Sequence, residues 1–214
     1  MSDQNLLTNR HSARDFSDRP VDLETLKAIL YTAQAAPSWE NTQPWKAYLA
    51  LGDVVQRIRQ HHFELASQGT KSWTEVVPPK TWAATPQANL DAWRANMLAF
   101  FSDEDQTRFV SGQKHLFNAP AIVYLTLPRD ASAYSAYDVG AFGYGILLAA
   151  EAHGVSGVPA YELVRYPAEI RQEFDIPTDE ALFMGIALGY PQDNRLNQLR
   201  PKRAPLDNVL QVRQ

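Results

Sequence analysis

The 214-residue sequence contains no cysteine, and this absence excludes several kinds of site at once. A disulfide framework, a thiolate zinc site, an iron–sulfur cluster and a cysteine nucleophile all depend on that residue. The sequence also lacks the glycine-rich fingerprints of Rossmann and P-loop proteins and the G-x-S-x-G elbow of hydrolases. The function must therefore rest on other chemistry.

Long apolar runs are missing as well. The longest, Val139 to Ala150, has 12 residues, whereas a membrane-spanning helix needs about 20. The first residues show neither the basic nor the apolar stretch of a secretory signal. We therefore expect a cytoplasmic protein that does not bind membranes.

Length and composition are typical of one globular domain over residues 1–214, with 45% apolar and 21% charged residues. The net charge of −4 is unevenly distributed, because residues 195–214 hold five basic residues and one acidic residue. A basic stripe over the whole domain, which would favour nucleic acid, is absent. The basic end could bind a small anion or the chain's own acidic surface, or it could simply be solvated.

Apolar periodicity predicts a layered α+β protein in which helices outweigh strands. The runs 119–127 and 181–189 are apolar without alternation, as is typical of strands buried on both faces. A third strand is predicted over 46–51. Helices are predicted over 22–35, 53–67, 87–101, 103–113, 135–153 and 167–174. Between them, residues 68–87 are predicted to form a long loop of the kind often used as a lid.

The predicted helix over 135–153 is apolar nearly all round. Gly154 would end it as the residue after the C-cap. Small residues such as Gly140 and Gly145 would let another helix approach closely. This pattern suits either a buried central helix or the seam of a homodimer.

Four segments contain residues that could bind a ligand. In the first, Arg10, Ser12 and Arg14 alternate, and two guanidiniums beside a hydroxyl suit a phosphate. The second, residues 36–45, combines prolines, tryptophans and amides that could hold a flat heteroaromatic ring. The simpler alternatives are a surface turn with two arginines and an ordinary helix-to-strand connection.

The third segment, residues 154–162, contains Gly157 and Pro159 and is predicted to turn with backbone N–H groups facing a ligand. A plain loop between a helix and a strand is the alternative. The fourth, residues 200–207, is a basic cluster framed by prolines, and it could bind the same anion as Arg10 and Arg14.

No side-chain acid–base pair stands out among the titratable residues. His61 and His62 lie about 100° apart on a predicted helix, so we expect them on the surface rather than as metal ligands. A protein with binding loops but no evident nucleophile or base often relies on a cofactor for its chemistry.

Taken together, these motifs resemble the FMN-dependent nitroreductase family over nearly the whole chain. The motifs that carry the resemblance are Arg10-x-Ser12-x-Arg14-x-Phe16, Ala36-Pro37-Ser38-x-x-Asn41-x-Gln43-Pro44-Trp45, Asp138-x-Gly140, Gly154-Val155 before Pro159, Gly189-Tyr190-Pro191 and Arg203-Ala204-Pro205-Leu206-Asp207. Each motif alone is weak, but their common order and spacing make the resemblance specific.

The resemblance implies a three-layer α+β fold with a central, mostly antiparallel sheet surrounded by helices. It also implies an intertwined homodimer in which residues 190–214 form an arm around the partner subunit, with FMN bound at the interface. By the resemblance, the residues that hold the phosphate are Arg10, Ser12, Arg14 and Arg203, with His11 contributing through its backbone and Arg200 and Lys202 as helpers. Those that line the ring are Pro37, Ser38, Trp39, Asn41 and Gln43 of the other subunit on one face and Pro159, Ala160, Tyr161 and Glu162 on the other. Trp39 departs from the family pattern, which commonly has a small residue there.

The implied activity is a ping-pong reaction in which NAD(P)H reduces the flavin and the same site then reduces a nitroaromatic, a quinone or a related electrophile. Chemistry at the flavin needs no catalytic side chain and no metal. Alternatives within the family are a flavin-fragmenting enzyme, a reductive dehalogenase and a dehydrogenase of peptide-type substrates. A non-catalytic flavin-binding protein remains a further alternative.

Overall fold

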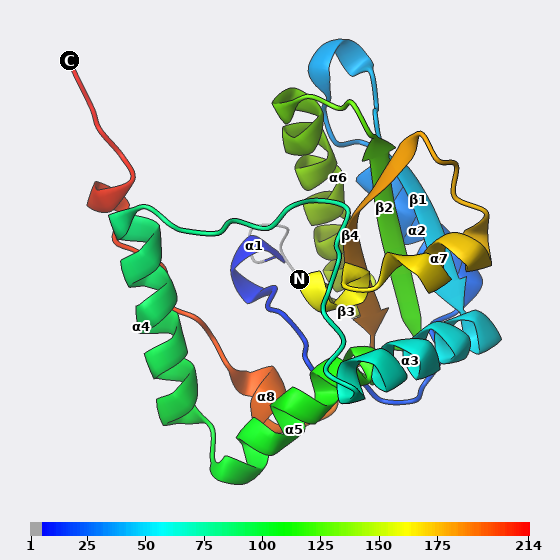
Figure 1. Cartoon of the computed structure of the whole chain (residues 1–214). Coiled ribbons are helices and arrows are strands. Elements are labelled where there is room, and N and C mark those ends of the chain that lie inside the picture. The colour runs from blue at the N-terminus through cyan, green and yellow to red at the C-terminus, as the bar shows by residue number, and fades with distance from the viewer. Residues whose placement is uncertain (1–5) are drawn as a thin grey trace.

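The computed structural model describes residues 6–214, in which a four-stranded antiparallel sheet has helices on both faces (Figure 1). The strands are β1 (Lys46–Leu51), β2 (Ala121–Pro128), β3 (Ser156–Ala160) and β4 (Glu180–Gly189), in the spatial order β1-β2-β4-β3. The helices are α1 (Leu6–Asn9), α2 (Leu23–Ala33), α3 (Gly52–Ser67), α4 (Ala84–Phe100), α5 (Asp103–Lys114), α6 (Ala133–Ala152), α7 (Pro167–Phe174) and α8 (Arg195–Gln198). Short 3₁₀ turns are η2 (Trp39–Asn41), η3 (Leu116–Asn118), η4 (Tyr161–Val164) and η5 (Leu206–Asn208). The predicted α+β architecture around a central sheet is confirmed.

Strand β2 separates two hydrophobic cores, because alternate side chains of a strand point to opposite faces. Ile122 and Tyr124 pack with α3 and α7 on one face. Val123 and Leu125 pack with α2 and α6 on the other. All four are buried, as the lack of alternation in this run predicted.

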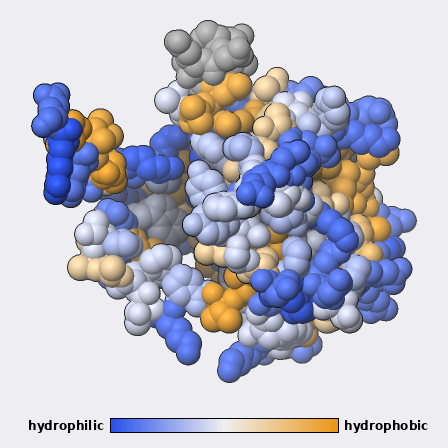
Figure 2. All heavy atoms as spheres, turned by 90° about the horizontal axis from the view of Figure 1, so that it is seen from above, coloured by the Kyte–Doolittle hydropathy of each residue, from blue (hydrophilic) through white to orange (hydrophobic). Residues whose placement is uncertain are grey.

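Helix α4 differs from the other long helices, since none of its residues is buried. In Figure 1 it stands apart from the sheet and lies next to the C-terminal segment. A third, smaller core of Phe101, Leu196 and Leu199 anchors the end of α4 to α8. Figure 2 shows the C-terminal segment projecting from the body with hydrophilic and hydrophobic residues on its surface.

Most predicted helix boundaries agree with the structure to within about three residues. Asp22 caps α2 by accepting a hydrogen bond from the N–H of Thr25. Gly154 has a φ of +70°, as expected of the residue that ends α6. No described helix is both long and apolar enough to cross a membrane.

The main error concerns residues 156–160, which were predicted as a turn and instead form β3 at the edge of the sheet. Proline is tolerated on an edge strand, where its missing N–H faces away from the ladder. Gly157 is required by packing, because a Cβ there would lie 2.8 Å from side-chain atoms of both Leu147 and Leu188. Gly157 and Pro159, which suggested a turn in the sequence, are therefore the residues that allow this strand to pack between α6 and β4.

Candidate active site

The N-terminal segment after α1 runs beside the outer edge of β3. Ser12 forms a parallel bridge with Gly157, and the N–H of Ala13 donates to the carbonyl of Gly157 (3.3 Å). Ala13 is fully buried, whereas Arg14 on its far side is half-buried. This pairing places the basic motif next to the turn that follows β3.

Three arginines, Arg10, Arg14 and Arg200, lie close together in this region without an ion-pair partner. The Arg14 guanidinium donates to the carbonyl of Ser12 (3.0 Å), and burial together with the charge of Arg200 lowers its pKa. Arg10 lies over the ring of Tyr144 (5.5 Å), and its buried Nε has no hydrogen-bond partner. Within residues 6–214, none of the three arginines forms an ion pair with a carboxylate.

His11 belongs to the same cluster. Burial and the charges of Arg200 and Arg10 outweigh the hydrogen bond that the His11 ring donates to the carbonyl of Asn9 and the charge of Glu151, so the pKa of His11 lies below its usual value. Positive charge that depresses neighbouring pKa values in this way favours a bound anion. The predicted phosphate residues Arg10, His11, Ser12, Arg14 and Arg200 are thus brought together by the fold.

A buried asparagine that the sequence did not single out holds this segment in place. Asn197 accepts a hydrogen bond from the N–H of Arg14 (2.6 Å). Its Nδ2 donates to the carbonyls of Asp15 (2.6 Å) and Gln192 (2.8 Å). Since it lies 183 residues from Arg14 in the chain, no local sequence pattern could reveal the contact.

Arg203 lies further along the C-terminal segment and is exposed. Its guanidinium donates to the carbonyl of Pro201 (3.0 Å). The chain thus brings Arg200 to the cluster around Arg14, whereas Arg203 is carried on the segment that projects from the body.

The loop over residues 37–43 is shaped by the N-terminal half of α6. Buried Asp138 accepts the N–H of Trp39 (3.0 Å). The hydroxyl of Ser38 accepts the N–H of Gln43 (3.0 Å), and Gln43 in turn donates to Asn41. The backbone φ is positive at Glu40, Asn41 and Gln43, a conformation that residues other than glycine rarely adopt. The sequence motif included Asp138 but did not indicate this anchoring contact.

Aromatic side chains gather on the surface of this loop. The rings of Trp39 and Tyr134 are 4.5 Å apart between centroids. With Tyr137 and Pro37 they line a cavity of about 580 Å³. The three aromatic residues are 53%, 61% and 76% exposed, respectively. Trp39, the residue that departs from the family pattern, thus forms one wall of a largely apolar cavity.

The turn after β3 presents its backbone rather than its acidic side chain. Pro159 is exposed, and the Tyr161 hydroxyl donates to Ser72 (2.8 Å). The carboxylate of Glu162 is turned inward to His62 (3.1 Å) and Arg165 (2.9 Å). Burial would raise the pKa of Glu162, but its interactions with His62 and Arg165 outweigh this effect and lower the pKa. His62 was expected on the surface and is instead buried, because it is the partner of this carboxylate.

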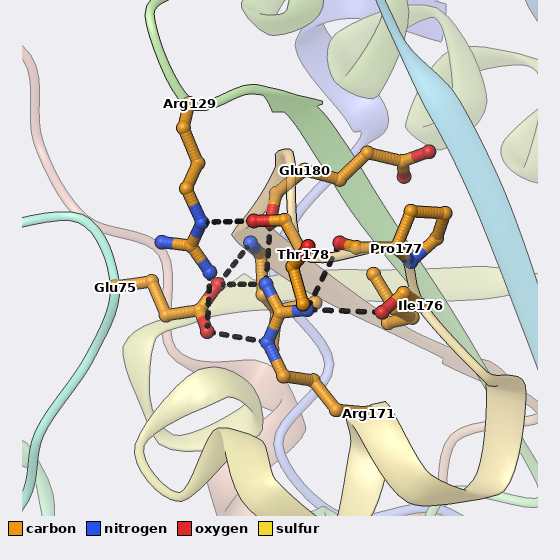
Figure 3. A network of polar contacts seen from close by, with 8 residues as sticks. Glu75, Arg129, Arg171, Ile176, Pro177, Thr178 and Glu180 are labelled. Atoms are coloured by element: carbon orange, nitrogen blue, oxygen red, sulfur yellow. Dashed lines mark hydrogen bonds and ion pairs between the residues drawn. The ribbon is translucent and has the colours of Figure 1, made fainter.

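The long loop before α4 is tied down over its first part. Glu75 receives two hydrogen bonds from Arg171 (2.5 and 2.7 Å), one from the N–H of Leu182 (2.7 Å) and one from Arg129 (3.3 Å), as Figure 3 shows. Burial alone would raise the pKa of Glu75, but these donors lower it. The irregular stretch is therefore anchored up to Glu75, and only residues 76–83 connect that anchor to α4.

The two parts of the predicted site contact different turns of α6. Loop 37–43 contacts Asp138, whereas Arg10 lies over the ring of Tyr144 (5.5 Å). Asp138 and Tyr144 are six residues apart, which is roughly 9 Å along a helix. The cavity beside loop 37–43 is lined by no residue of the cationic cluster.

Comparison with known proteins places this geometry in context. The model of the family described as "Nitroreductase family" matches residues 7–190. A chloronitrobenzene nitroreductase of Comamonas testosteroni is 28% identical, and a nitrobenzene nitroreductase of Ectopseudomonas oleovorans is 29% identical. Each alignment covers 94% of this chain and 92% of the relative.

Solved structures show the same fold. The FMN-dependent nitroreductase NfnB from Mycobacterium smegmatis, in complex with NADPH, superposes with a TM-score of 0.89 at 23% identity. That match covers 99% of this chain and 97% of the other. The FMN- and NADPH-dependent NfnB from "sphigopyxis sp. strain HMH" superposes with a TM-score of 0.84 at 25% identity over the full length of both chains. The predicted nitroreductase-like fold is confirmed.

Proposed function

Because the chain belongs to the nitroreductase family, we propose that it is an FMN-dependent oxidoreductase that takes electrons from NAD(P)H and reduces nitroaromatics, quinones or related electrophiles. The observation that carries this proposal is the cluster of Arg10, Arg14 and Arg200, which has no acidic partner among the described residues. The reductases of nitroaromatic compounds among its relatives support the class of acceptor.

The cluster suits the phosphate of FMN. Arg10 and Arg14 are half-buried, so bringing them together costs free energy that a counter-charge would offset, and the unpartnered Nε of Arg10 has a hydrogen bond left to make. Arginine offers forked donors that match phosphate oxygens. We assign Arg10, Ser12, Arg14 and Arg200 to the phosphate, with His11 contributing its backbone and Arg203 joining from the C-terminal segment.

The ring of FMN would lie between two subunits. The backbone of Pro159, Ala160 and Tyr161 would face one side, since the carboxylate of Glu162 is already engaged. Residues 37–43 of a second copy, with Pro37, Ser38, Trp39, Asn41 and Gln43, would cover the other. A division of this kind accounts for the finding that no residue of the cationic cluster lines the cavity beside loop 37–43 of its own chain.

The outer face of α6 and the C-terminal segment support a homodimer. Tyr137, Gly140 and Tyr144 recur on the exposed side of α6, where glycine permits close helix contact. Leu206, Val209, Leu210 and Val212 are all exposed. Apolar side chains on a projecting segment suit an arm that packs on a partner.

When bound, FMN would supply the chemistry of hydride and electron-pair transfer between the nicotinamide donor and the acceptor. The chain's own residues position the phosphate, shield the ring from water and keep positive charge nearby, which stabilises added electrons. No side chain is required to act as an acid or base.

A heterodimer tests the division of the site between subunits. Chains carrying Arg14→Ala or Ser38→Trp would be co-expressed with different tags and purified through both. Each homodimer should lose FMN, because one lacks the phosphate ligand and the other fills the space of the ring. The doubly tagged heterodimer keeps one intact site and should bind about half as much FMN as the unaltered dimer. A heterodimer without FMN would refute the shared site.

The reductase activity is tested by anaerobic absorption spectra. The flavin band should bleach with NADPH or NADH and return when a nitroarene or quinone is added. A flavin that neither donor reduces would refute the oxidoreductase and indicate a flavin-binding protein instead.

A further inference from the structure

His62 is a buried polar side chain to which the proposed function gives no role. It lies on α3 and is only 4% exposed, whereas the neighbouring His61 is half-buried. Its Nε2 lies 3.1 Å from Oε1 of Glu162, and its ring packs against that of Tyr166, with 5.2 Å between the centroids. Burying a polar ring costs free energy unless its hydrogen bonds are made. The contact with Glu162 therefore offsets the cost of placing a histidine here.

The hydrogen bond runs from His62 to Glu162. Burial would raise the pKa of Glu162, but hydrogen bonds from His62 and Arg165 lower it, so the carboxylate is ionised at neutral pH. An ionised carboxylate only accepts hydrogen bonds. The Nε2 of His62 must therefore carry the proton that it donates, and Arg165 donates to the same oxygen (2.9 Å).

Glu162 lies in η4, the turn that directly follows β3. Residues 159–161, just before it, are those whose backbone is proposed to face the flavin. On the sheet side the turn is held by Leu163, which packs so closely on Gly185 that a Cβ added there would overlap with the leucine side chain. His62 ties the same turn to α3. The position of the flavin-facing backbone thus depends on a buried contact with a second element.

We propose that His62 is a positioning residue, which holds the flavin-facing backbone through Glu162 and so raises the reduction potential of bound FMN. This inference rests on the proposed function, because it requires FMN beside residues 159–161. Donors aimed at the ring stabilise the negative charge added on reduction more than they stabilise the oxidised ring. A turn that can shift therefore weakens the binding of reduced FMN more than that of oxidised FMN. A carboxylate without its donor acts in the same direction, since negative charge near the ring opposes added electrons.

The reduction potential is measured on the FMN-loaded dimer by stepwise addition of dithionite against a reference dye. His62→Leu should weaken reduced FMN about tenfold relative to oxidised FMN, as the loss of one hydrogen bond to a charged group implies. For a two-electron couple this lowers the potential by about 30 mV. His62→Gln, whose carboxamide can still donate to Glu162, should keep the potential of the unaltered dimer. His61→Leu is the matched control on the same helix and should also leave the potential unchanged.

A role in folding alone predicts a different result. It would lower the Tm of His62→Leu but leave its potential equal to that of His61→Leu, which would overturn the proposal. A potential for His62→Gln as low as that for His62→Leu would overturn it too. If His62→Leu does not fold, His62→Asn takes its place, because its carboxamide is one methylene shorter than that of glutamine and does not reach Glu162.

The proposed function and the role of His62 can fail separately. Reduction of FMN by dithionite but by neither NADPH nor NADH would refute the proposed oxidoreductase, while the potentials of the variants would still decide the role of His62. An unaltered dimer that binds no FMN would overturn both.

Discussion

The two ends of α6 present opposite kinds of surface. Near its N-terminal end, the one buried charge, Asp138, is satisfied by the N–H of Trp39, and the surroundings are aromatic. Beside its C-terminal half, Arg10 and Arg14 supply positive charge, and neither forms an ion pair with a carboxylate among the described residues. The carboxylate at one end is thus completed by a hydrogen bond within the chain, whereas the cations at the other have no carboxylate paired with them.

This difference indicates what each end does. A ligand with a flat ring and a phosphate tail needs both surfaces, but within one chain no residue of the cationic cluster lines the aromatic cavity. The completed end can serve as a preformed wall. The charged end depends on its ligand for full stability, so FMN should stabilise the charged end more strongly than the completed end.

The largest effect should come from removing the support of the charged end. Asn197→Leu would remove three hydrogen bonds. The N–H of Arg14 would lose its partner, whereas the carbonyls of Asp15 and Gln192 would keep only the backbone N–H groups of Gln192 and Asn194. At about 1 kcal/mol for each lost hydrogen bond, the free energy of unfolding should fall by about 3 kcal/mol. Denaturant unfolding measures this, with exposed Gln198→Leu on the same helix as the control. Equal midpoints for the two variants would contradict the assignment.

Removing a charge from the same end should weaken FMN directly. Arg14→Ala should cost about 1.5–3 kcal/mol of binding free energy, or roughly tenfold to a hundredfold in Kd. Arg203→Ala should cost less, because that side chain is exposed and its charge is screened. Titration of the apoprotein with FMN, followed by flavin fluorescence, would rank the two. A larger loss for Arg203 would reverse our view of which arginine holds the phosphate.

At the completed end, a change should act on the loop rather than on charge. Asp138→Leu would leave the N–H of Trp39 unpaired and should lower the free energy of unfolding by about 1–2 kcal/mol. Asp138→Asn keeps an oxygen acceptor and should retain most of the stability. Tryptophan fluorescence and Tm would separate the variants, and indistinguishable behaviour of Leu and Asn would show that the contact is unimportant.

The smallest effect concerns a region outside both ends and depends on pH. Donors from Arg171 and Leu182 lower the pKa of Glu75 against the opposing effect of burial, so its ionised form stabilises the fold. That contribution is complete above about pH 4.3, the ordinary pKa of glutamate, and is lost as the pH falls through the lowered value. Glu75→Gln should therefore cost about 1 kcal/mol at pH 7. The difference from the unaltered chain should shrink in acid, as Tm values at pH 7 and pH 3 would test.

Much of the fold could be predicted because the sequence features that determine it lie close together in the chain. The apolar run of β2 and the capping of α2 by Asp22 follow from neighbouring residues. Strand β3 could not be found in this way. Its five residues include Gly157 and Pro159, and only pairing with β4 makes them a strand. The burial of His62 was missed for the same reason, since its partner Glu162 lies 100 residues away.

The same distinction between local and tertiary features applies to the candidate site. The motif around Arg10 and Arg14 could be recognised because it is a short run of one chemistry. The contacts that hold it, from Asn197 to Arg14, depend on tertiary structure. The tether of Glu75 to Arg171, which are 96 residues apart, is likewise invisible in the sequence. The proposed binding residues thus lie in motifs, whereas the residues that position them are distributed along the chain.

The marginal place of α4 has an evolutionary consequence. In the described chain, residues 76–96 contribute no side chain to any of the three cores. Substitutions, insertions or deletions there would leave the packing of the sheet unchanged and cost little folding stability. This helix could therefore diverge in sequence and length through evolution while the sheet and the helices packed on it stay intact.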